Sequence, residues 1–142
     1  GNSEVDAKCT MPVIATLACA MVETEDQIDI KPGSKLAALL GVDHLIEGFR
    51  CSYGVNPEYL PLFAGSKLRF TGTDAGSAPC AFELADHPFF IGTAFQPERH
   101  ALRGKSHNLI ETFVAAAVQR NGPLFEAHLE RGKNGGNTIQ RL

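Results

Sequence analysis

The sequence predicts an α/β fold in which strands fill the middle of the chain and one long helix follows them. Residues 67–85 contain two strand-like segments joined by a Gly-Ser-Ala-Pro loop, which is typical of a hairpin. Residues 106–123 carry an apolar stripe at helical spacing, made of Leu109, Ile110, Phe113, Val114, Ala117 and Val118. Because few helices accompany the strands, we expect a part of a larger α/β sheet with one under-covered face.

The first third of the chain predicts two strands and a short helix. Residues 11–23 are apolar with several β-branched side chains, which favours a strand. Residues 27–34 alternate at period two and end in a Pro-Gly turn, so we expect a hairpin with the preceding strand. Ser34 then stands at an N-cap position, and Gly41 can end the helix.

The remaining elements follow from similar signals. Residues 43–56 predict a strand that Asn56 and Pro57 end, followed by a loop with a helical turn. Residues 89–95 are apolar on both faces, which suits a central strand covered on two sides. We expect Ser106 to cap the long helix, and we interpret its apolar stripe as core unless a missing half of the fold leaves it uncovered.

Composition excludes several classes of function. The net charge is -3 and the basic residues are scattered, which argues against a nucleic-acid partner. No apolar run approaches the roughly 18 residues of a membrane span, and we expect a cytoplasmic protein without a membrane partner. The cysteines form no C-x-x-C pair, so the sequence predicts neither a zinc site nor a disulfide scaffold, and no cofactor.

One stretch is more specific, namely Asp86 to His100, which reads "DHPFFIGTAFQPERH". Together with "GSKLAALLG", "YGVNPEYLPLFAGSKLRFTGTD" and "HNLIETFVAAAV", in that order and spacing, it resembles the glutaminase domain of CTP synthase. The resemblance is strongest to shorter proteins related to that enzyme's C-terminal region. It implies a class I glutamine amidotransferase fold, a flavodoxin-like and mostly parallel sheet with flanking helices. It also implies that these residues are the C-terminal part of such a domain.

The resemblance implies glutamine hydrolysis that supplies ammonia to pyrimidine nucleotide synthesis, by a cysteine nucleophile, a histidine base and a glutamate that orients the histidine. In that family the nucleophilic cysteine lies in a Gly-x-Cys-x-Gly turn, and these 142 residues contain no such pattern. Gln96 stands in place of the histidine, and an amide cannot take the thiol proton. Glu98 keeps the orienting position without an imidazole to orient.

The predicted substrate pocket departs from the family as well. By the resemblance it contains Arg50, Cys51, Ser52 and Tyr53, and Ser52 stands where the family has an arginine that holds the substrate. A serine cannot offer a charged, planar fork to a carboxylate. We therefore expect the chain alone not to be a glutaminase, with Cys51 as the candidate for a reactive thiol.

Two hypotheses stay open at this point. Either the chain is a piece of a catalytic protein that another segment completes, or it is a non-catalytic binding or regulatory module with a glutamine-like ligand. His100 could replace the lost base, although a solvated histidine is the simpler interpretation, and His107 shows no metal spacing. We expect residues 1–123 to form the domain and residues 124–142 a short amphipathic piece and a mobile tail. An uncovered sheet edge and an apolar helix face would favour a homo-oligomer.

Overall fold

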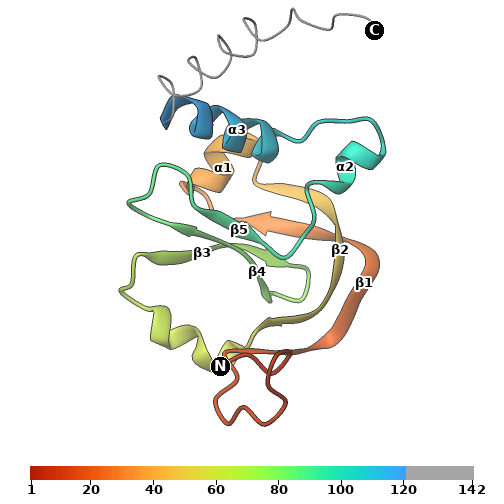
Figure 1. The fold of residues 1–142 in the computed structure, drawn as a ribbon, viewed down its shortest axis with the longest axis vertical. Coiled ribbons are helices and arrows are strands. Elements are labelled where there is room, and N and C mark those ends of the chain that lie inside the picture. The colour runs from red at the N-terminus through yellow and green to blue at the C-terminus, as the bar shows by residue number, and fades with distance from the viewer. Residues whose placement is uncertain (121–142) are drawn as a thin grey trace, which may run out of the picture.

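The computed structural model describes residues 1–120, apart from the side chains of residues 18–22 and 120. The amphipathic piece and tail predicted at 124–142 lie outside the described residues. The described chain forms one sheet of five strands in the order β2-β1-β3-β4-β5. Figure 1 shows the helices α1, α2 and α3 at one end of this sheet and the short helix η1 at the other, near the N-terminus.

The strands of this sheet pair antiparallel. Their bounds are β1 Ile14–Ile30, β2 His44–Val55, β3 Leu68–Asp74, β4 Pro79–Leu84 and β5 Ile91–Thr93. The prediction of a mostly parallel sheet is therefore wrong for the described residues. A parallel pair needs a crossover of a dozen or more residues, and the connections from β3 to β4 and from β4 to β5 are far shorter.

The hairpin predicted between residues 11–23 and residues 27–34 is wrong, because both segments belong to the single strand β1. The chain between them lacks the Gly, Pro or Asn of a tight turn. It has an irregularity instead: Glu23 adopts a left-handed φ of 54°, and the register against β2 shifts between Val22 and Thr24. A bulge of this kind re-aims a side chain without ending the strand.

Several local predictions are confirmed. Helix α1 (Lys35–Leu40) begins after Ser34, whose hydroxyl accepts from the Ala37 N–H, and ends at Gly41 with a left-handed φ of 71°. Asn56 caps the 3₁₀ helix η1 (Pro57–Phe63), and β3 and β4 form the predicted hairpin. The long helix is α3 (Asn108–Arg120), but the side-chain acceptor at its start is His107 and not Ser106.

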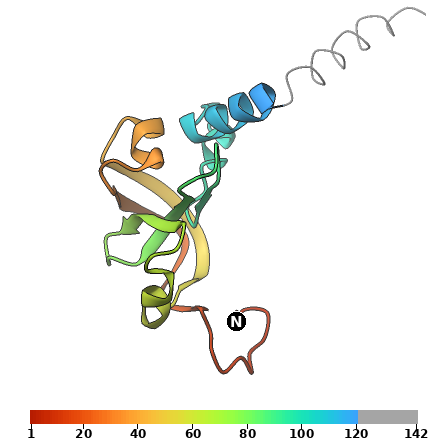
Figure 2. The ribbon, with the colours of Figure 1, turned by 90° about the vertical axis from the view of Figure 1, so that its left-hand side faces the viewer.

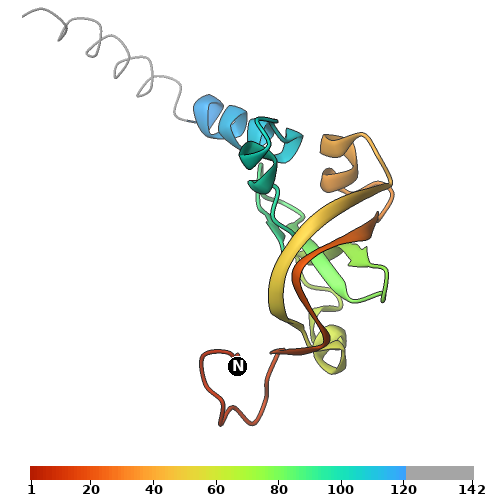
Figure 3. The same cartoon turned by 90° about the vertical axis from the view of Figure 1, so that its right-hand side faces the viewer.

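The strand predicted from residues 89–95 is neither central nor long. β5 has three residues at the end of the sheet, pairs with β4 and is half-buried. Its continuation turns to the far edge, where Phe95 bridges antiparallel to Phe49 of β2. The two edges of the sheet thus approach each other through this bridge, and the long β1–β2 ribbon curves around the molecule in Figures 2 and 3.

The core lies between the curved sheet and α1. Its fully buried side chains are Phe49, Phe95, Ile28 and Leu36, and Leu109 at the start of α3 adds to them. The Phe49 and Phe95 rings meet edge to face with centroids 6.3 Å apart. Aromatic pairs in this geometry stabilise a core beyond their buried area.

The interpretation of the α3 stripe as core is wrong for most of its length. Leu109 is buried, whereas Ile110, Phe113, Val114 and Val118 expose 42%, 54%, 54% and 37% of their surface. We expected this stripe to be core unless a missing half of the fold left it uncovered, and its exposure in the described residues fits that alternative. Among the described residues, no helix combines the length and the apolar character that crossing a bilayer requires.

A buried carboxylate holds α1 on the sheet. Glu83 of β4 is 5% exposed, and its two oxygens accept from the backbone N–H groups of Lys35 and Leu36, each at 3.1 Å. These are the N–H groups at the start of α1, which have no partner inside the helix. The Lys35 ammonium donates in turn to backbone carbonyls of the β4–β5 connection, Ala85 at 2.7 Å among them.

Replacing Glu83 by alanine should lower the free energy of unfolding by about 1–3 kcal/mol, because two buried N–H groups lose their acceptor. Urea unfolding followed by circular dichroism measures this loss. The matched control is Glu58→Ala on the exposed start of η1, which should stay within about 0.5 kcal/mol. Equal effects of the two substitutions would contradict the role given to Glu83.

Candidate functional site

Gln96, which the resemblance predicts at the position of the histidine base, lies against β2. The Gln96 backbone N–H donates to the Gly48 carbonyl at 2.9 Å, directly after the Phe95–Phe49 bridge. Its side-chain oxygen accepts from Arg99 Nη1 at 3.3 Å. Gln96 is therefore held at both its backbone and its side chain, and the side chain offers no titratable group.

Arg99 extends this contact across to β1. Its Nη2 donates to Glu23 Oε2 at 2.6 Å, and Arg50 Nε lies 3.4 Å from Glu23 Oε1. The Arg99 side chain passes over Gly48, where its Cδ would lie at the contact distance of 3.4 Å from a Cβ. Two predicted site residues, Gln96 and Arg50, are thus joined through Arg99 and Glu23.

The left-handed backbone of Glu23 places its carboxylate between the two arginines. The hydrogen bond and the charge of Arg99 lower the pKa of Glu23 below its ordinary value of 4.5, and the charge of Arg50 has a smaller effect in the same direction. The same pair raises the pKa of Arg99, chiefly through its hydrogen bond to Glu23. Glu23 is exposed and Arg99 only half-buried, so this pair orients side chains more than it stabilises the fold.

The other predicted site residues do not converge on Gln96. Glu98 precedes helix α2 (Arg99–Leu102), and its exposed side chain makes no capping hydrogen bond. Ser52 lies four residues beyond Gly48 on β2, about 13 Å along a strand. By strand alternation it shares the face of Arg50, whereas Cys51 and Tyr53 lie on the opposite face.

Cys51 shows no sign of activation in its surroundings. The half-buried Cys51 thiol donates to the Tyr53 carbonyl at 2.9 Å and accepts from the Tyr53 backbone N–H at 3.4 Å, so its sulfur contacts the backbone of its own strand. The buried Cys80 is further from reactivity, because burial raises the pKa of its thiol to about 12 and the nearby Asp74 carboxylate adds to the shift. A thiol needs the thiolate form to attack.

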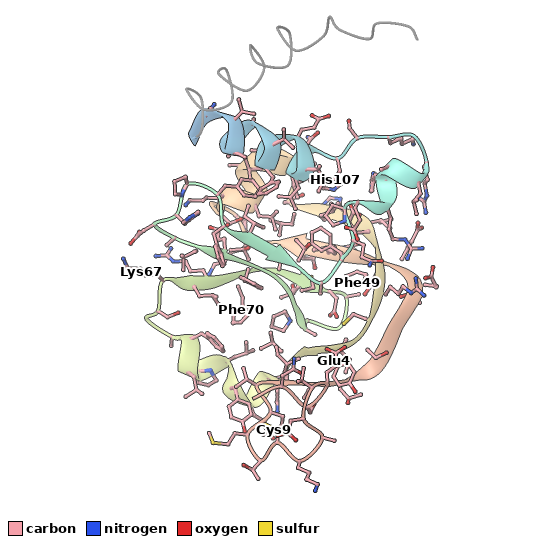
Figure 4. The ribbon with its side chains drawn as sticks, in the orientation of Figure 1. Glu4, Cys9, Phe49, Lys67, Phe70 and His107 are labelled. Carbon is pink, nitrogen blue, oxygen red and sulfur yellow. The ribbon has the colours of Figure 1, made fainter. Side chains whose placement is uncertain are left out.

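A second group of polar side chains, which we call the Glu47 cluster, consists of Glu47, His100 and His107. Glu47 of β2 is 3% exposed, and its Oε1 accepts from His107 Nε2 at 2.9 Å. Its Oε2 lies 3.2 Å from His100 Nε2, and the two imidazole rings meet edge to face at 4.9 Å. Figure 4 shows His107 at the start of α3, near Phe49 of the sheet.

The Glu47 cluster was missed in the sequence because its members come from β2, α2 and the start of α3. The interpretation of His100 as a solvated histidine is wrong in part, since its side chain is 34% exposed and bonded to a buried carboxylate. The ligand atoms of the cluster lie within 4.8 Å of one another, so their spacing alone would allow a metal ion. A signal was present in the sequence: Glu47 is a charged residue at an inward position of an otherwise apolar strand face.

A small cavity of about 230 Å³ adjoins this cluster. Its lining residues are Glu25, Ile46, Glu47, Gly48, Arg99, His100 and Arg103. Arg103 Nη2 donates to Glu25 Oε1 at 2.8 Å, so α2 is tied to β1 at this point as well. The cavity thus lies beside Gln96 and between α2 and the β1–β2 ribbon, with a histidine and two arginines on its wall.

Removing Arg99 should raise the pKa of Glu23 back toward 4.5, because the largest cause of its lowering is lost. Removing Arg50 should raise it less. Carboxyl ¹³C shifts followed against pH in Arg99→Ala and Arg50→Ala measure both changes. The lowered pKa means that this pair favours the folded state above pH 4.5 and loses that contribution as the pH falls through the lowered value. A larger shift in Arg50→Ala would contradict the geometry.

Comparisons with known proteins agree with the resemblance drawn from the sequence. Over 93 residues, 65% of this chain, the sequence is 37% identical to CTP synthase of Methylocella silvestris and 34% identical to that of Brucella ovis. The matched part covers 17% of either enzyme, so the chain spans a small part of these relatives. No family model matches the chain.

The fold agrees with the same assignment. The glutaminase domain of Trypanosoma brucei CTPS, solved with bound acivicin, superposes with a TM-score of 0.74 at 21% identity, over 82% of this chain and 50% of that one. A putative GMP synthase subunit from Thermoplasma acidophilum gives 0.56 at 9% identity, over 78% of this chain and 51% of that one. The chain is therefore similar in sequence to CTP synthases, and its described residues have the fold of about half of a class I glutamine amidotransferase domain.

Proposed function

We propose that this chain is a binding or regulatory module on the amidotransferase scaffold, with a small glutamine-like ligand, and that it does not hydrolyse glutamine by itself. The observation that best supports the proposal is the hydrogen bonding of the Gln96 side chain. Its amide accepts from Arg99, which is held in turn by Glu23, so the position of the family's base is filled by a network without a proton acceptor of suitable strength.

The neighbouring positions support the same proposal. Ser52 replaces the arginine that holds the substrate in the family, and the 142 residues contain no Gly-x-Cys-x-Gly turn. The thiol of Cys51 lies on the face of β2 opposite to Ser52 and donates to the Tyr53 carbonyl. Nucleophile, base and substrate clamp act as one unit, so the loss of the nucleophile alone removes the covalent route.

A second candidate function is glutamine hydrolysis completed by residues beyond these 142. The observation that favours it is the overlap with the T. brucei domain, of which 50% has a counterpart here. Glu98 and Arg50 also keep their family positions. In that case the module would serve pyrimidine nucleotide synthesis as the glutaminase region of CTP synthase does. A cytoplasmic location and a homo-oligomer stay predictions, and the exposed α3 face supports the latter.

The 142-residue chain should release no ammonia from glutamine above the rate of buffer. Gln96→His should not restore release, because these 142 residues contain no Gly-x-Cys-x-Gly turn whose cysteine the new imidazole could activate, and Cys51→Ser should match the wild type. A coupled ammonia assay measures all three. Turnover in the wild-type chain that disappears in Cys51→Ser would overturn the proposal that the chain does not hydrolyse glutamine by itself. Turnover in the full-length gene product but not in this chain would favour the second candidate.

A further inference from the structure

We propose that His100 is a general base for a small anionic substrate in the 230 Å³ cavity, with Glu47 as the residue that positions it. This goes beyond the function proposed above and does not depend on it, because the base acts without a thiol and at a different position from Gln96. His107, the neighbour of His100 in the cluster, makes a hydrogen bond at each of its two ring nitrogens.

The start of α3 fixes the tautomer of His107. The backbone N–H of Leu109 donates to His107 Nδ1 at 3.1 Å, so this nitrogen carries a lone pair and not a proton. In a neutral imidazole the proton then lies on Nε2, which donates to Glu47 Oε1 at 2.9 Å. His107 is buried, with 7% of its side chain exposed, and its orientation is therefore held from both sides.

The second oxygen of Glu47 fixes His100 in the same way. Glu47 Oε2 accepts from His100 Nε2 at 3.2 Å, which leaves the lone pair of a neutral ring on Nδ1. Among the described residues, none hydrogen-bonds to His100 Nδ1. An imidazole oriented by a buried carboxylate, with its other nitrogen unprotonated, is the arrangement of a base and its orienting partner.

The tautomer of His107 argues against a metal ion in the cluster. A metal on Nε2 of a neutral imidazole requires a proton on Nδ1, where the Leu109 N–H already points. Two donors would then face each other at 3.1 Å, and the start of α3 would lose its cap. The spacing of the three residues thus suits hydrogen bonding better than it suits coordination.

The cavity wall indicates the class of substrate. Arg103 uses Nη2 for Glu25, and its other N–H groups have no partner among the described residues. A guanidinium carries five donors, so it can bind a carboxylate while keeping this ion pair. The volume is below the range of drug-sized pockets, about 300–1,000 Å³, which suits a molecule of a few carbons.

The chemical step is a proton transfer. An O–H or N–H bond of the bound substrate breaks, its proton moves to His100 Nδ1, and the electron pair stays on the substrate. The imidazolium formed lies against the Glu47 carboxylate, whose negative charge stabilises it. The other charged groups around the cavity, Glu25 with Arg103 and Glu23 with Arg99, are already paired.

The first test determines which ring nitrogen of His100 and of His107 carries the proton. Two-bond ¹H–¹⁵N spectra at about pH 8, where ordinary imidazoles are neutral, should show His100 and His107 protonated on Nε2. In Glu47→Gln the amide oxygen faces His107 and the NH₂ faces His100, so His100 should change to the Nδ1-protonated form while His107 stays unchanged. A residue that only packs would not produce this selective change. Nδ1 protonation of His100 in the wild type would overturn the proposal.

The second test determines whether the cavity binds an anion. It remains valid if the Glu47→Gln variant does not fold. Glutarate added to the wild-type chain should shift the His100 ring signals, whereas the uncharged glutaramide should not. Arg103→Ala should weaken glutarate binding at least tenfold, and Arg69→Ala, which removes an exposed charge on β3, should not. No shift with glutarate, or equal shifts with both probes, would contradict the anionic class. Zn²⁺ that shifts His100 and His107 together at micromolar concentration would make the cluster a metal site and overturn the proposal.

Discussion

The interaction on which this end of the structure depends is the buried carboxylate of Glu47 with its two histidine donors. A carboxylate with 3% exposure destabilises a fold unless it is hydrogen-bonded, and here each oxygen has a ring nitrogen within 3.2 Å. Because His100 belongs to α2 and His107 precedes α3, a single side chain of β2 holds both helical segments on the sheet. The cavity beside Gln96 takes its shape from this attachment.

Two ion pairs join the α2 segment to β1 beside the Glu47 cluster. Arg99 and Arg103 reach Glu23 and Glu25 of β1, and Arg99 also holds the amide of Gln96. Ion pairs near the surface contribute little to stability, so their effect is to orient the residues around the cavity. Gln96, the residue predicted at the position of the base, is thereby held in an ordered network.

The sequence allowed the local elements to be predicted where a side chain acts on its own neighbours. Ser34 and Gly41 begin and end α1 through contacts a few residues away, and these predictions are confirmed. Asn56 and Pro57 follow the end of β2 as predicted, and Asn56 also caps η1. Strand pairing could not be predicted as well, because a left-handed Glu23 bulge continues β1 where a turn was expected. The short β5 and the Phe49–Phe95 bridge likewise depend on the curvature of the whole sheet.

The candidate site was likewise predictable from the sequence only in part. Gln96 and Arg50 could be named from the resemblance, but their connection through Glu23 and Arg99 joins three distant segments. The Glu47 cluster joins residues separated by 53 and 60 positions, and no spacing in the sequence indicates it. The exposed face of α3 was foreseen as an exception, because periodicity shows which residues share a face and not what covers it.

Hydrogen exchange of the Leu109 amide in Glu47→Ala tests most directly whether Glu47 holds this end of the fold together. This amide donates to His107 Nδ1, whose ring is positioned by Glu47. We expect the exchange of this amide to become at least tenfold faster, while the amides that pair β3 with β4 keep their protection. Unchanged protection of Leu109 in a folded variant would contradict the role given to Glu47, since the start of α3 would then be held without the carboxylate.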